Sequence, residues 1–248
     1  MQRLTVFFVY YVFLYVKVIP DGRGKKMKMM CTSELCAGDV LLCYKDTKID
    51  LTGKVITRVT DSEYTHAAIC ISSSVAAEAT VLVGVSKVQI EDLIKRYDHV
   101  AVFRQPDAWQ PPERIQAMNA FIDSIIASNA KYNLRDVVDF KKQNEAHRLT
   151  LIEQLNEFFN GTYTSAPIEK GSYFCSELVA SCFVITGFID PSAAVLYQSN
   201  VISPGALGRD PTFGTFCGYV SSVSNYAVPT KDEFFNRSTF DEIYRNGK

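Results

Sequence analysis

SYFCSELVASCFVITG, residues 172–187, is the segment with the clearest structural pattern in this chain. Its apolar side chains recur at intervals of three and four residues, which is the period of an amphipathic α-helix. Gly187 follows the pattern, and glycine is the residue most often found just past a helix end. The segment therefore predicts a core-facing helix that begins close to Cys175, with a buried stripe of Cys175, Leu178, Val179, Cys182 and Phe183.

Cys175 differs from the other six cysteines by its position at a helix start. A thiolate is the reactive form of cysteine, and a helix N-terminus lowers a thiol pKa from its ordinary value near 8.5. Cys182 lies two helical turns further on the same face, where it is expected to pack as a small hydrophobe. The cysteines show no paired spacing typical of structural zinc. We expect no disulfide framework and no cofactor.

A nucleophilic cysteine needs a base, and the chain has three histidines. His147 lies among polar residues of a predicted helix, where a solvated role is expected. His99 precedes an apolar run and is expected in a turn or at the surface. His66 opens the strongly apolar run HAAICISSS, so it is either a buried structural histidine or the base.

Two apolar runs on either side of the turn Ser72–Ser74 predict a β-hairpin. The run HAAICISSS at residues 66–74 supplies the first strand and this turn, and residues 75–90, VAAEATVLVGVSKVQI, supply the return strand. In that pairing Glu78 is near-opposite His66. A lone carboxylate in an apolar strand is costly unless it is paired, so we expect Glu78 to hold the imidazole.

The remaining segments predict a mixed α+β fold, with three or four strands and several helices. The order lacks both the regular β-α alternation and the glycine-rich phosphate loop of a doubly wound sheet. The further strands expected are residues 37–45 and 99–106. The helices expected are 90–97, 110–133 and 144–159, with a helix or loop over 50–65, and loops with one more strand from residue 190 to 220.

The composition is that of a globular chain, with 26 basic and 27 acidic residues and a net charge of −1. No cluster of charge indicates nucleic-acid binding. Residues 1–34 form an apolar N-terminal extension that reads as a signal segment, as a membrane anchor, or as sequence ahead of a start at Met27 to Met30. The last reading implies a cytoplasmic protein, and the others an exported or membrane-associated one. Residues 35–248 are expected to form one domain, with 141–171 as an insertion or lid.

Six motifs follow one another along the chain, in the order GDVLLCY, SEYTHAAI, AEA with GV following, KYN, YFCSELV and SPGAL. Together they resemble the YiiX/YebB-like proteins, from the circularly permuted branch of the NlpC/P60 papain-like superfamily. The resemblance runs from about Gly38 to about Gly218. It implies an α+β fold in which the cysteine helix packs on a small antiparallel barrel-like sheet.

The resemblance also implies roles for individual residues. Cys175 would be the nucleophile, His66 the base and Glu78 the orienting third residue. Tyr132, in KYN, falls where the family has a recurrent tyrosine and is a candidate substrate-binding residue. The substrate implied is an amide bond in a peptide or peptidoglycan-like molecule.

Three other readings stay open from the residues alone. The same triad would serve a lipid acyltransferase or thioesterase acting on an acyl substrate near a membrane. The fold would also suit a non-catalytic binding protein. A cysteine, a histidine and a glutamate could instead ligate zinc, although a zinc site gives no reason for a cysteine at a helix start.

Overall fold

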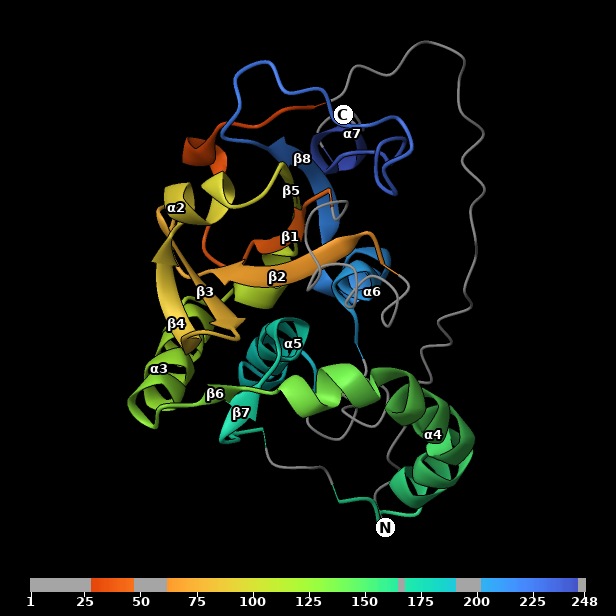
Figure 1. Cartoon of the computed structure of the whole chain (residues 1–248). Helices are drawn as coiled ribbons and strands as arrows, with labels where there is room; N and C mark the ends of the chain where they lie inside the picture. The colour runs from red at the N-terminus through yellow and green to blue at the C-terminus, as the bar shows by residue number, and fades with distance from the viewer. Residues whose placement is uncertain (1–27, 47–61, 165–167, 191–201, 245–248) are drawn as a thin grey trace.

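A computed structural model describes residues 28–46, 62–164, 168–190 and 202–244 of the chain (Figure 1). Its centre is a six-stranded antiparallel sheet with strand order β4-β3-β2-β1-β5-β8. A separate two-stranded parallel pair joins β6 to β7. The strands are β1 (Val40–Tyr44), β2 (Tyr64–Cys70), β3 (Val75–Thr80), β4 (Gly84–Gln89), β5 (His99–Arg104), β6 (Lys131–Tyr132), β7 (Ser172–Tyr173) and β8 (Thr215–Val220).

Helices cover both faces of the sheet, so the fold is α+β as expected. Figure 1 shows α5 below the central strand β2 and α2 on the opposite side. The helices are α2 (Ile90–Lys95), α3 (Glu113–Ala127), α4 (Leu134–Phe159), α5 (Cys175–Ile185), α6 (Pro204–Arg209) and α7 (Phe240–Tyr244), with short 3-10 turns at Thr32–Glu34, Pro106–Trp109 and Pro211–Phe213.

The alternation of side chains along each strand divides the core into two clusters. On β1, Val40 and Leu42 pack with α3 and α5, whereas Leu41 and Cys43 pack with α2 on the other face. Helix α5 is buried on every side from Cys175 to Val184. A helix that is buried on every side lies in the centre of a core, and α5 packs there against β2 and β3.

The predicted helix start at Cys175 is confirmed, since α5 begins at that residue. The short helix at 90–97 and the helix within 110–133 are also confirmed, as α2 and α3. The serine turn is confirmed because the Ile71 N–H donates to Val75 O at 2.9 Å. The part of the expected helix or loop at 50–61 lies outside the described residues.

The single return strand predicted for residues 75–90 is wrong, because the segment folds into two strands, β3 and β4. The chain turns through Val81–Val83, and Gly84 adopts a φ of 81°, which favours glycine. A Cβ on Gly84 would also lie 2.4 Å from the carbonyl oxygen of Ala130. This second hairpin extends the sheet to β4 and brings its edge against the end of α3.

Two helical segments were missed by the sequence interpretation. The helix expected at 144–159 already begins at Leu134, so the boundary proposed at residue 141 falls inside α4. The segment before residue 144 contains Leu134, Val137 and Val138 at helical spacing, so its interpretation as a polar linker is wrong. Helix α6, placed among loops, starts at Pro204 with Ser203 as its N-cap, whose hydroxyl accepts from the Ala206 N–H.

The sheet is open, whereas a barrel-like sheet was expected. Its outer strand β8 is extended by a parallel bridge to Met29. The Met30 N–H donates to Tyr219 O at 2.7 Å, and the Tyr219 N–H donates to Lys28 O at 2.9 Å. Residues 28–30, which precede the expected domain start at Leu35, therefore already pair with the sheet. In the described ranges, no helix combines the length and apolarity needed to cross a membrane.

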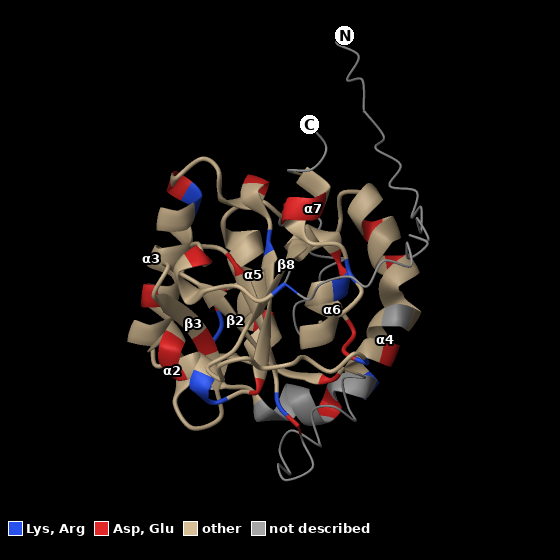
Figure 2. Ribbon diagram, turned by 90° about the horizontal axis from the view of Figure 1, so that it is seen from above, with Lys and Arg blue, Asp and Glu red and all other residues tan. Residues whose placement is uncertain are grey.

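Lysine and arginine residues are interspersed with aspartate and glutamate over the described part of the chain (Figure 2). Several of the charges are paired across elements. Arg104 donates to both carboxylate oxygens of Asp39 at 2.7 Å, and Arg209 contacts Glu233 at 2.6 Å.

Candidate active site

Cys175 is the first residue of α5, and the residues before it fix the start of the helix. Phe174 is extended, and its N–H donates to Oε2 of Glu177 at 3.2 Å. Lys170 donates to the other oxygen of Glu177 at 2.7 Å. Glu177 is fully buried, and its contact with the Phe174 N–H caps the start of the helix. The amides of the first turn have no partner within the helix, and Cys175 is the first residue of that turn.

The sheet opens at the point where Cys175 meets it. Pairing between β2 and β3 is confined to Ala68–Cys70 opposite Ala76–Glu78. Beyond Ala68 the two strands separate, and α5 packs against both. The Ala67 N–H then donates to the sulfur of Cys175, as does the Ser176 N–H. The thiol therefore lies in a gap between strands, where backbone donors favour its charged form.

His66 and Glu78 form the pair expected from the hairpin. Their Nε2 and Oε2 atoms are 2.9 Å apart, and both side chains are buried. The register differs from the expectation, because Glu78 lies opposite Ala68 and reaches His66 diagonally. The imidazole is also hydrogen-bonded to Cys175. Because Glu78 occupies Nε2, Nδ1 is the nitrogen left for the sulfur.

Arg96 and Tyr97 complete the surroundings of this pair, and sequence reasoning missed both. Nη2 of Arg96 lies 2.7 Å from Oε1 and 2.8 Å from Oε2 of Glu78. The ring of Tyr97 stacks on the His66 ring, with centroids 5.7 Å apart and planes inclined by 6°. Both residues follow the short helix α2. The apolar periodicity of this helix predicts where it ends but not which residues its end contacts. No signal in the sequence linked them to Glu78.

Tyr132 lies beside the same sulfur, as the resemblance suggested for a residue near the site. Strand β6 pairs Tyr132 with Tyr173, two residues before Cys175. The Lys131 N–H donates to Gly171 O and the Asn133 N–H to Tyr173 O, each at 3.0 Å. Burial and a hydrogen bond to Cys175 raise the pKa of Tyr132, so its hydroxyl stays protonated and able to donate.

The electrostatics favour a thiolate beside an imidazolium. Burial raises the pKa of Cys175, but His66 and two backbone N–H groups outweigh it and lower the pKa below its ordinary value. Burial opposes charge on His66, yet hydrogen bonds to Cys175 and Glu78 raise its pKa to about 9. Burial likewise raises the pKa of Glu78, and His66 and Arg96 lower it further than burial raises it. Glu78 is therefore ionised near neutral pH.

The other two histidines lie away from Cys175, and His99 corrects an expectation. His99 is fully buried, not a turn or surface residue. Its Nε2 is 3.0 Å from Oδ2 of Asp232, and the hydroxyls of Tyr64 and Tyr219 donate to the same carboxylate. This network ties the C-terminal segment to the sheet. His147 is half-buried in α4.

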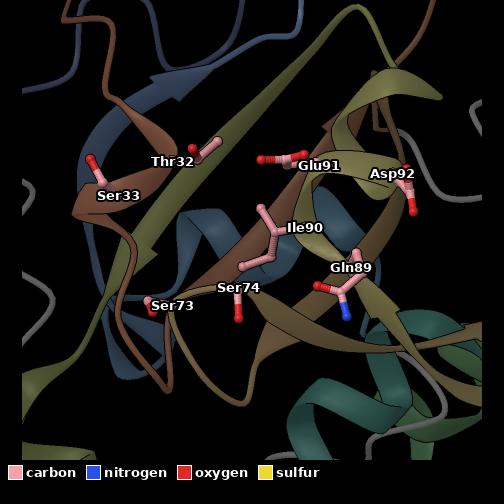
Figure 3. A pocket seen from close by; sticks show the side chains of 8 residues that line it. All are labelled: Thr32, Ser33, Ser73, Ser74, Gln89, Ile90, Glu91 and Asp92. Carbon is pink, nitrogen blue, oxygen red and sulfur yellow. The ribbon is translucent and has the colours of Figure 1, made fainter.

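Cys182 is fully buried, which confirms its packing role, and burial raises its thiol pKa. Among the described residues, no three His, Cys, Asp or Glu side chains are grouped so as to hold a metal ion. An open hollow of about 450 Å³ lies at the other end of the hairpin from His66 (Figure 3). Hydroxyl, amide and carboxylate groups line it, and it contains no nucleophile paired with a base.

Comparison with known proteins adds no family name to this geometry. No protein-family model matches the chain. A search of curated proteins also finds no match.

Proposed function

We propose that this protein is a papain-like cysteine hydrolase of the circularly permuted NlpC/P60 type, which cleaves an amide bond in a peptide or peptide-like molecule. The observation that carries the proposal is the hydrogen-bonded series Cys175, His66 and Glu78, with the cysteine at the first position of a buried helix. The chain order of histidine, acid and cysteine supports the permuted arrangement. A structural cysteine needs neither a paired imidazole nor a lowered pKa.

The chemistry follows from these positions. The Cys175 thiolate attacks the carbonyl carbon and forms a C–S bond, while the carbonyl π electrons move onto the oxygen. As the tetrahedral species collapses, the C–N bond breaks and the His66 imidazolium gives its proton to the leaving amine. His66 then takes a proton from water, whose oxygen attacks the acyl carbon. This second tetrahedral species collapses, the C–S bond breaks, the carboxylic acid leaves, and the thiolate–imidazolium pair is restored.

The negative oxygen of the tetrahedral species needs two donors near Cys175. The first donor is the backbone N–H of Cys175. Cys175 is the first residue of α5, so this amide lies at the positive end of the helix dipole. Tyr132 supplies a second donor, since its hydroxyl already contacts the sulfur. Donors that are fixed before the reaction act without reorganisation, which is the largest contribution to many acyl transfers.

Covalent trapping tests this function. The protein is mixed with an N-acyl peptide carrying a chromogenic amide, and separately with a long-chain acyl thioester, and each reaction is quenched rapidly in acid. We expect the peptide to release its amine and to leave its acyl half on Cys175, detected by intact mass and peptide mapping. An adduct from the thioester alone would replace the amide proposal with a lipid acyl function. Absence of any adduct, together with no alkylation of Cys175 at neutral pH, would indicate a binding protein.

Tyr132→Phe tests the oxyanion assignment. Removing one such donor costs about 10²- to 10³-fold in kcat, so we expect a loss of that size with KM nearly unchanged. The alkylation of Cys175 by a small reagent, which forms no oxyanion, should change far less. Tyr244→Phe, which changes an exposed tyrosine of α7, is the control. A Tyr132→Phe protein with normal kcat and a raised KM would assign Tyr132 to substrate binding.

A further inference from the structure

Glu78 lies between two cationic partners, and only one of them belongs to the proposed triad. The residue is 3% exposed, whereas the Arg96 side chain is 41% exposed. The guanidinium therefore reaches inward from the surface to a buried carboxylate. A single nitrogen, Nη2, contacts both oxygens, while His66 contacts Oε2 only.

A buried carboxylate in this position has two alternatives without Arg96. Burial favours its neutral form, and a neutral acid holds an imidazolium poorly. If it stays ionised with His66 as its sole partner, it is free to rotate about that one contact. Arg96 prevents both outcomes, because its charge offsets the carboxylate and its nitrogen sits between the two oxygens.

The fold delivers Arg96 to this place through α2. Ile90, Leu93 and Ile94 bury the helix against the sheet face that carries Cys43 and Ala68. The Arg96 N–H donates to Leu93 O and the Tyr97 N–H to Ile94 O, each at 3.1 Å. Arg96 thus leaves the helix at a fixed point, and the next residue stacks on the His66 ring.

We propose that Arg96 is a positioning residue, which holds Glu78 ionised and in register with His66 and so keeps the Cys175–His66 pair ready for reaction. The inference rests on the proposed function of that site. Arg96 touches no reacting atom. It acts through Glu78, both of whose oxygens its Nη2 contacts, and its guanidinium also lies 5.9 Å from the centre of the Tyr97 ring.

The sign of its effect follows from the groups that face the site. They are Cys43 from β1, His66 from β2, Glu78 from β3, Tyr97 after α2, Tyr132 from β6 and Cys175 from α5. Without Arg96, Glu78 either keeps an uncompensated negative charge near the sulfur or takes up a proton and stops supporting the imidazolium. Both results make the thiolate harder to form, so the acid limb of Cys175 reactivity moves to higher pH.

The test is the rate of Cys175 alkylation by iodoacetamide as a function of pH, resolved by peptide mapping because Cys31 and Cys36 are exposed. Nearby charges shift a pKa by about 1 to 3 units. We expect Arg96→Met to move the acid limb up by about one unit, which slows labelling near pH 6 about tenfold. Arg96→Lys keeps the positive charge but loses the contact of one nitrogen with both oxygens of Glu78. The acid limb of Cys175 labelling should therefore stay in place while kcat falls several-fold. The matched control is Lys95→Met, which removes a neighbouring charge from an exposed pair with Asp92 and should change neither quantity.

A double-variant cycle separates positioning from folding. In a Glu78→Gln background, Arg96→Met should cause little further loss of kcat, since its target is gone. An unchanged acid limb in Arg96→Met, or additive losses in the cycle, would overturn the inference. If the unaltered protein itself shows Cys175 alkylation only near the pH of an ordinary thiol, the proposed function fails instead. Thermal unfolding of each variant identifies any that do not fold, and Arg96→Lys then carries the test.

Discussion

A Cys175→Ala protein is expected to lose all measurable turnover and to form no acyl adduct, yet to remain folded. Removing the nucleophile of such a unit costs about 10⁶-fold in kcat, because the base and the donors have no attacking atom left to serve. The change deletes one sulfur atom and leaves the helix backbone in place. Initial rates on the amide substrate, with circular dichroism as the check on folding, measure both effects.

Cys182→Ala is the matched control for that experiment. Cys182 is in the same helix and fully buried, but its thiol contacts only core atoms, and burial raises its pKa. The variant should lose about 1 kcal/mol of stability, as core truncations do, and keep its turnover. Residual turnover in Cys175→Ala above that of a mock preparation would contradict the assignment of the nucleophile.

His66→Ala is expected to give the second largest loss, at least 10³-fold in kcat. It removes the proton donor for the leaving amine and the charge that lowers the pKa of Cys175. Alkylation of Cys175 should then require a pH near or above the ordinary thiol value of about 8.5. In the unaltered protein the imidazolium persists up to its pKa of about 9, so labelling should already be fast well below that pH.

The pH dependence of labelling distinguishes this role from a structural one. His147→Ala replaces the half-buried histidine of α4 and should alter neither rate nor acid limb. His99→Ala should instead lower the melting temperature, since it removes a partner of the buried Asp232. If His66→Ala kept a low-pH acid limb, the base would have to be assigned elsewhere.

Candidate site residues could be predicted where a local sequence pattern marked the position or where burying a charged group required a partner. Cys175 was found because helical periodicity has a definite start, and Glu78 because an acid in an apolar strand needs a partner. His99 was misjudged for the converse reason. Its partner Asp232 is 133 residues away in sequence, and no local pattern indicates a contact at that separation.

Arg96 shows the same limit more sharply. Its neighbours in sequence describe an exposed helix end, which is the usual place for an arginine. Only the packing of α2 on the sheet turns that position toward Glu78. The turn between β3 and β4 was missed for a similar reason. Its residues are apolar, so the sequence looks like one continuous strand until the separate pairing of β3 and β4 is known.

The amino-acid sequence by itself determined the α+β class, the helix that starts at Cys175 and the candidate residues His66 and Glu78. Helical periodicity and the cost of burying a charge each depend on a few neighbouring residues, so both can be recognised in a short stretch of sequence. Three features were decided by tertiary structure alone. They are the open sheet, the contact of the Ala67 N–H with the Cys175 sulfur, and the contact of Arg96 with both oxygens of Glu78. These depend on how separate elements pack, and packing energy is shared among residues far apart in the chain.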